Sequence, residues 1–283
     1  MRRKNRGKQT LKKKMLSILL LSAMSSILAV VIVSYMTIRM IQNDGIKESM
    51  QIYLEQITRE MDSDYYDMIG IVNQMSPDGL IGSATERYLS SNDNYDRYLE
   101  QKFLREELIK LGYVNTKLLG ITYYDPKEQK ELIGNFNVRV LDPSYQTISK
   151  VVVGADNTIQ AMHDSYLGIK ETPVVSVMRR VSFGNQKMLD IYAEMEPDMS
   201  VSDQLNKEKW PYTYMEMDEN GIVQYSNNPV IVQGQKILSE LPKKEGHAVT
   251  NQEGYKIMVY RSTIGYANAI ALPENIYQKE MNM

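Results

Sequence analysis

The first 38 residues combine a dense group of positive charges with a long uncharged run directly after it. Eight of the first fourteen residues are Lys or Arg, and residues 16–38 contain no charged side chain and no proline. A helix of 23 residues, rising about 1.5 Å per residue, covers the roughly 30 Å hydrocarbon core of a bilayer. We therefore predict a membrane-spanning helix over residues 15–38, with residues 1–14 as a basic cytoplasmic tail.

A cleavable secretory signal is the alternative, but its apolar part is normally shorter, and no convincing cleavage site follows this run. With an uncleaved anchor, residues 39–283 are extracellular. They hold all 35 acidic residues against 25 basic ones, since eight of the 33 Lys and Arg precede the run, so a nucleic-acid partner is not expected. The chain has no cysteine, which removes disulfides and thiolate metal sites.

Directly after the membrane run, apolar residues recur at alternating steps of four and three, which predicts one long stalk helix over residues 39–75. The seam has one polar member, Asp64, which can fix the register of the helix or lie at a solvated position. The seam either packs on its own domain's sheet or also pairs across a dimer, and the pattern leaves both open. Its members are Met50, Leu54, Ile57, Met61, Asp64, Met68, Ile71 and Met75.

Beyond Ser76-Pro77-Asp78-Gly79, which ends the stalk helix, a second helix is expected at 95–111, and the pattern then changes to strands. Turn signals at Asp125-Pro126, Gly184-Asn185 and Asn220-Gly221 predict antiparallel hairpins. A short helix over 198–208, closed by Trp210-Pro211, is expected to divide two modules that look like duplicates. The expected strands are 118–124, 131–138, 173–181, 188–195, 212–217, 222–225, 255–260 and 266–271.

Three stretches, 173–195, 214–225 and 255–273, resemble the extracellular double Cache sensor region, most closely that of Firmicutes sensor histidine kinases of the LytS/YesM type. The resemblance implies an α+β fold: a transmembrane helix, a stalk helix and two PAS-like antiparallel-sheet (Cache) modules. It also implies a homodimer in the membrane. The implied segments are a membrane-distal module at 76–209, a membrane-proximal module at 210–275 and a juxtamembrane end at 276–283.

The same sensor region also precedes chemoreceptors and diguanylate cyclases, so the output of the protein is left open. The chain carries no catalytic or ATP-binding motif, and we predict that it is not itself an enzyme, although the full-length protein that it resembles is a histidine kinase. It ends before a second membrane span, which indicates a sensor fragment or a truncated product. A surface-anchored interaction protein without a sensory role is the alternative from another class.

Tyrosine outnumbers phenylalanine by 20 to 3, and a tyrosine wall offers apolar rings together with hydroxyls that orient a polar solute. Arg would bind a carboxylate and Glu an ammonium group. The alternative is that most of these tyrosines are ordinary half-buried strand residues. The predicted ligand-binding residues are Tyr123, Tyr124, Arg139, Tyr145, Tyr166, Arg179 and Glu194.

The expected ligand is an unknown small molecule or an extracellular protein, with no cofactor. His163 and His247 are the only histidines, and both are predicted to be surface residues without metal-ligand spacing. The segment from Asp218 to Gly221 lacks the alternating oxygen ligands of a calcium loop and is predicted to be a turn.

Overall fold

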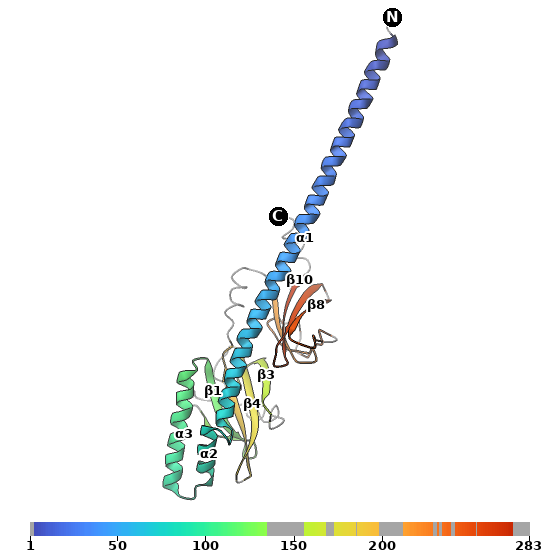
Figure 1. The fold of residues 1–283 in the computed structure, drawn as a ribbon. Helices are drawn as coiled ribbons and strands as arrows, with labels where there is room; N and C mark the ends of the chain where they lie inside the picture. Colours follow the sequence, from blue (N-terminus) through green and yellow to red (C-terminus); the bar gives the residue numbers. More distant parts are fainter. Residues whose placement is uncertain are drawn as a thin grey trace. The chain divides into compact units, whose positions relative to one another are not determined.

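The structure is a computed structural model, and its described residues form three helices and ten strands (Figure 1). They divide into two compact units, one reaching to Met50 and the other made of residues 51–274. Both five-stranded sheets belong to the second unit. The described residues are 3–134, 156–167, 173–184, 186–197, 212–228, 231, 234–238, 241–252 and 254–273.

Helix α1 runs without interruption from Arg3 to Met75. Its early part contains an apolar stretch that is long enough, and sufficiently free of charge, to cross a membrane. The large apolar side chains of that stretch, from Met15 to Ile41, are exposed. A helix with exposed apolar side chains on all sides requires an apolar surrounding, as a bilayer provides.

The part of α1 that lies in the second unit carries the heptad seam, and that seam is buried. Leu54, Ile57, Met68 and Met75 have no exposed surface. The seam therefore packs within its own chain. Asp64, its polar member, is 3% exposed and its Oδ1 lies 2.7 Å from Lys117 Nζ, so an ion pair ties the helix to the start of the first sheet.

Two shorter helices, α2 (Leu80–Ser90) and α3 (Asn94–Val114), pack side by side after α1 (Figure 1). Asp93 caps α3, because its Oδ1 accepts hydrogen bonds from the backbone N–H groups of Tyr95 and Asp96. The sequence predicted α3, with bounds of 95–111, but not α2. The residue before α2 is Gly79, which makes no side-chain cap, so the usual start signal is missing.

The first sheet contains five antiparallel strands in the order β2-β1-β5-β4-β3. Its hairpins β1–β2 and β4–β5 lie where the turn signals predicted them. Strand β3 was not predicted. The strands are β1 (Leu118–Asp125), β2 (Lys130–Gly134), β3 (Thr158–His163), β4 (Val174–Phe183) and β5 (Lys187–Met195).

The second sheet has the order β7-β6-β10-β9-β8, which is the order of the first sheet shifted by five strands. This identity of topology confirms the predicted duplication and the fold class: a long helix followed by two antiparallel-sheet modules. Strand β8 was not predicted, and the short helix expected at 198–208 lies outside the described residues. The strands are β6 (Thr213–Met217), β7 (Val223–Ser226), β8 (Gly246–Gln252), β9 (Tyr255–Arg261) and β10 (Ala267–Pro273).

The predicted turn at Asp218 is confirmed. Asp218 Oδ1 accepts hydrogen bonds from the N–H groups of Asn220 and Ile222, and Gly221 adopts a φ of 76°, a conformation that favours glycine. The carboxylate thus serves the backbone of its own turn.

Candidate ligand-binding site

The two faces of the first sheet differ in character because successive side chains of a strand point to opposite sides. One face packs toward α1. On this face the Tyr123 hydroxyl donates to the backbone oxygen of Met75 at 2.5 Å, and Arg179 donates to Asn73 Oδ1 at 3.2 Å. Phe183 lies edge-on against the ring of Tyr123. The helix therefore covers this side of the sheet.

The opposite face, which we call the polar face, carries charged and hydroxyl side chains on β1, β4 and β5. The strand registers place Thr122 opposite Tyr192, Tyr124 opposite Asp190, and Ser176 opposite Glu194. Buried charged groups are uncommon, and a sheet face that only closed a core would be apolar. The polar face comprises Thr122, Tyr124, Ser176, Arg180, Asp190, Tyr192 and Glu194, all at most 1% exposed except Arg180.

Arg180 and Asp190 are directly opposite each other on β4 and β5 and form a two-pronged ion pair. The guanidinium Nε lies 2.7 Å from Asp190 Oδ1, and a terminal nitrogen lies 3.0 Å from Oδ2. Asp190 is fully buried, whereas the Arg180 side chain is 28% exposed. Burial, together with the negative charge of Asp190, raises the pKa of the Tyr124 hydroxyl.

Glu194 holds a turn over the polar face. Its Oε2 accepts from the Ser165 hydroxyl at 2.6 Å, and its Oε1 accepts from the backbone N–H groups of Tyr166 and Leu167 at 2.7 and 3.0 Å. The Tyr192 hydroxyl also donates to Oε1 at 2.6 Å. Burial raises the pKa of Glu194, and these donors oppose that rise. The carboxylate is thus occupied in positioning residues 165–167.

The held turn brings an aromatic pair against the polar face. The ring of His163 stacks on that of Tyr166 with centroids 4.2 Å apart, and Tyr166 lies 6.0 Å from Tyr192. His163 Nδ1 lies 2.6 Å from the backbone oxygen of Asp164, and because a carbonyl oxygen can only accept, Nδ1 carries the hydrogen. Nε2 then accepts from the Ser176 hydroxyl at 2.7 Å. Burial lowers the pKa of His163, which favours this neutral form.

The structure brings three of the seven predicted ligand-binding residues together: Tyr124, Tyr166 and Glu194 lie on or over the polar face. Tyr123 and Arg179 lie on the other face, against α1, so the expectation of one shared wall does not hold for them. Strand alternation explains this split, because both are sequence neighbours of polar-face residues. Arg139 and Tyr145 lie outside the described residues. Sequence reasoning missed Arg180, Asp190 and Tyr192. Alternation from Glu194 back along β5 would have indicated Tyr192 and Asp190, whereas Arg180 on β4 follows only from its pairing with Asp190.

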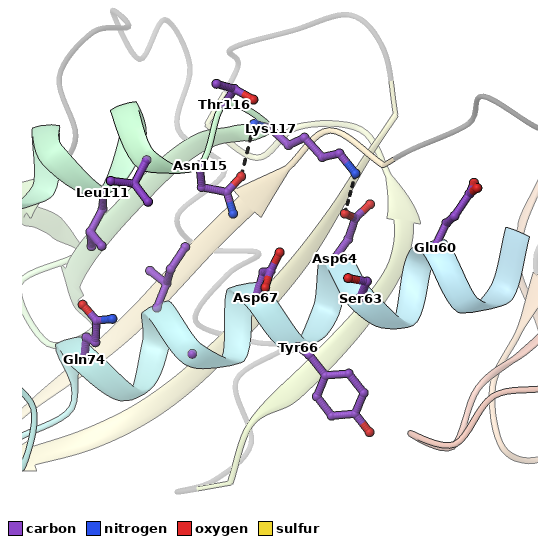
Figure 2. A pocket seen from close by; sticks show the side chains of 13 residues that line it. Glu60, Ser63, Asp64, Tyr66, Asp67, Gln74, Leu111, Asn115, Thr116 and Lys117 are labelled. Atoms are coloured by element: carbon purple, nitrogen blue, oxygen red, sulfur yellow. Dashed lines mark hydrogen bonds and ion pairs between the residues drawn. The ribbon is translucent and has the colours of Figure 1, made fainter.

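A cleft of about 620 Å³ lies between α1 and the segment that joins α3 to β1 (Figure 2). In Figure 2 Lys117 points at Asp64 on the helix, and Asp67 and Glu60 lie on the same helix to either side. The Lys117–Asp64 contact anchors the helix to the first strand. The cleft therefore lies at the contact between α1 and the α3–β1 segment, which this ion pair holds together.

His247 is exposed, as expected of a surface residue, whereas His163 is half-buried, contrary to that expectation. His163 belongs to the network described above, and His247 Nε2 lies 3.6 Å from Glu55 with its ring edge-on to Tyr260. Within the described ranges, no group of three or more His, Cys, Asp or Glu side chains is arranged to hold a metal ion.

No family model matches the sequence, and no curated protein matches it. Solved structures of sensor domains do match its fold. The ligand-binding domain of Mlp24 with asparagine has a TM-score of 0.53 at 13% identity, covering 87% of this chain and 99% of that one. The periplasmic sensory domain of the Campylobacter jejuni chemoreceptor Tlp1 has a TM-score of 0.51 at 13% identity, covering 83% and 98%. These likenesses confirm the predicted fold class, a long helix followed by two antiparallel-sheet modules.

Proposed function

We propose that this chain is the sensory input region of a membrane-anchored signalling protein. The proposal joins a helix long enough to cross a membrane to a fold shared with the chemoreceptor sensory domain of Tlp1. In this arrangement residues 1–14 are cytoplasmic, residues 15–38 span the bilayer, and the two sheet modules are extracellular. Eight basic residues before the apolar run support that orientation.

The polar face is our proposed ligand site. The observation that carries this proposal is the burial of two carboxylates, Asp190 and Glu194, beside the partly exposed Arg180, on the sheet face that α1 does not cover. Groups with perturbed pKa values and buried charges gather at functional sites, because a structure that only needed stability would use apolar residues there. A small polar solute would find ion-pairing groups there and the rings of Tyr124 and Tyr166.

Within this site the residues have different roles. Arg180 and Asp190 offer a donor fork and an acceptor, so a ligand with a carboxylate or an ammonium group would compete for one partner of the pair. Tyr124 and Tyr166 provide rings and hydroxyls at the same face. Glu194 is a positioning residue, since its oxygens are engaged by the turn that carries Tyr166. Arg139 and Tyr145 remain candidates from the sequence.

For the output we propose a histidine kinase of a two-component system, acting as a homodimer. This finer assignment rests on the resemblance of residues 173–195, 214–225 and 255–273 to LytS/YesM-type sensors. Sequencing the gene beyond the codon for Met283 tests it. A reading frame that continues through a second span into a phosphoacceptor helix supports the kinase, whereas a chemoreceptor or cyclase domain there contradicts it.

The ligand site is tested with the full chain in detergent micelles, by a thermal-shift screen of amino acids, organic acids, sugars and peptides. A ligand that binds only the folded state raises the melting temperature by mass action. The neighbours Arg179 and Arg180 form a matched pair on opposite faces of β4. Arg180→Ala should abolish the ligand-induced rise and Arg179→Ala should retain it. Equal rises in both variants would remove the polar face as the site.

The topology has its own test because the native chain lacks cysteine. Single cysteines introduced as Thr10→Cys and Glu219→Cys report on the two sides of the membrane. In intact cells a membrane-impermeant maleimide should label only the Glu219→Cys variant. Labelling of Thr10→Cys instead would reverse the proposed orientation.

A further inference from the structure

The segment from Gln160 to Leu167, which ends β3 and forms the turn over the polar face, is held by two buried carboxylates from different sheets. Glu194, on β5 of the first sheet, binds residues 165–167. Glu216, on β6 of the second sheet, accepts a hydrogen bond from the backbone N–H of Met162 at 2.9 Å. One short segment therefore touches the proposed ligand site and the second module.

Glu216 also connects this segment to α1. The Tyr65 hydroxyl lies 3.1 Å from Glu216 Oε1 and 3.0 Å from the backbone oxygen of Gln160. Both Tyr65 and Glu216 have no exposed surface. Helix, first sheet and second sheet thus meet at a single buried carboxyl group.

The number of hydrogens at this junction depends on the charge of Glu216. The Tyr65 hydroxyl has one hydrogen but faces two acceptors, the Gln160 carbonyl and the carboxylate. If Glu216 is ionised, one of the two contacts lacks a hydrogen of its own. If Glu216 is protonated, its O–H donates to Tyr65 and the Tyr65 hydroxyl donates to Gln160, so both contacts are satisfied. The protonated form therefore fits the observed geometry.

The surroundings favour the same form. Burial raises the pKa of Glu216 to about 7, against the opposing effect of the donors from Met162 and Tyr65. Within the described part of the chain Glu216 makes no ion pair with Lys or Arg, in contrast to Asp190. The titratable groups that face it or share its surroundings are Tyr65 on α1, Asp164 after β3, Tyr214 on β6, Tyr225 on β7 and Tyr266 before β10.

We propose that Glu216 is the positioning residue that couples the polar face of the first sheet to the second sheet and to α1, and that this coupling loosens when Glu216 ionises. The coupling acts through β3, whose hydrogen bonds to Tyr65 and Glu216 are complete only with the protonated acid. Its meaning for signalling rests on the proposed function, because a sensor must pass a change at its ligand site toward the membrane. Changes in external pH around neutrality are then expected to alter the response of the protein to its ligand.

Hydrogen exchange of the 158–163 segment tests the coupling in the full chain in micelles, without any ligand. Exchange rates of wild type and Glu216→Gln are compared at pH 6 and pH 8, so that intrinsic exchange cancels at each pH. Glutamine reproduces the neutral hydrogen-bond pattern. With pKa values of about 7 when closed and 4.5 when open, opening of β3 becomes about tenfold more frequent in wild type between these pH values. Glu216→Gln should lack this increase.

Glu219→Gln is the matched control, because Glu219 lies exposed on the next turn and should behave as wild type. Equal exchange of wild type and Glu216→Gln at both pH values would overturn the proposal. If Glu216→Gln does not fold, Tyr65→Phe serves instead. Tyr65→Phe removes a hydroxyl donor to Glu216 and so further disfavours the ionised form of that residue. The pH at which β3 exchange is half-increased should therefore rise in this variant. An unchanged midpoint would contradict the coupling.

The two proposals fail in different ways. A ligand screen without any hit, together with pH-dependent exchange of β3, would contradict the proposed small-molecule sensor and still support the coupling through Glu216. A ligand-induced thermal shift, together with identical exchange in wild type and Glu216→Gln, would contradict the coupling through Glu216 and still support the proposed sensor.

Discussion

Replacement of Glu216 by glutamine should stabilise the protein at high pH and leave its stability unchanged at low pH. In the folded state the pKa of Glu216 is about 7, against 4.5 in the unfolded chain. A carboxyl group with a raised pKa contributes stability below its unfolded pKa, and this contribution is lost as the pH rises toward 7. Each pH unit within that window corresponds to about 1.4 kcal/mol, so ionisation of Glu216 costs about 3 kcal/mol by pH 8.

Urea unfolding of the full chain in micelles, followed by intrinsic fluorescence, measures this difference. At pH 8 Glu216→Gln should be more stable than wild type by about 3 kcal/mol, and at pH 4.5 the two should agree within error. The comparison of variant with wild type cancels the contributions of Glu194 and the other carboxylates. Glu219→Gln should match wild type at both pH values. A Glu216→Gln variant that is less stable than wild type at pH 8 would show that the buried acid is ionised and stabilising, and would refute the reasoning.

The other predictions concern urea unfolding of single variants at pH 7. Glu194→Gln should destabilise the protein by about 2 kcal/mol, because an amide cannot accept from all the donors that converge on the carboxylate; unchanged stability would show that the turn holds without them. Asp190→Asn should cost about 2 kcal/mol by breaking the two-pronged pair with Arg180, and no loss would make that pair energetically neutral. Gly82→Ala should cost about 2 kcal/mol or more, because its Cβ would lie 1.7 Å from the backbone oxygen of Ser76, whereas Gly70→Ala, with nothing within 4 Å, should stabilise α1 by up to about 1 kcal/mol. The same sign for both glycine variants would contradict this packing.

Sequence patterns predicted the elements that carry strong local signals. The seam of α1 has a heptad period, and the hairpins at Asp125-Pro126 and Asn220-Gly221 have turn residues that preset the backbone. The missed elements lack such signals. Polar residues occupy three of the six positions of β3 and four of the seven of β8, and the two strands belong to their sheets through pairing with β4 and β9. Tertiary pairing, not local propensity, determines these edge strands.

The candidate site was predicted only in part, for a related reason. Residue types indicated tyrosines, an arginine and a glutamate on β1, β4 and β5, and the structure keeps Tyr124, Tyr166 and Glu194 together. The sequence does not state which face of a strand meets α1, and a shift of one position exchanges Arg179 for Arg180. Only the observed register, with Arg180 opposite Asp190, settles which arginine belongs to the polar face.

The two modules share a topology but use their faces in opposite ways. In the second sheet the face toward α1 is polar: Tyr214 contacts Met61 Sδ at 3.1 Å and Asn268 donates to Thr58 Oγ1 at 3.0 Å. Its other face packs an apolar cluster that includes Met215, Ala269 and Leu238.

In the first sheet the buried carboxylates of Asp190 and Glu194 are turned away from the helix. Polar groups that hydrogen-bond a helix fix its position and register, whereas in the proposed site a charged solute would compete for one partner of the Arg180–Asp190 pair, which lies away from α1. Under the proposed function, a ligand on the first sheet would act on α1 through β3 and Glu216, because Glu216 hydrogen-bonds both Met162 on β3 and Tyr65 on α1. In the proposed mechanism the first sheet presents the ligand site, and the second sheet supplies Glu216, which links β3 to α1.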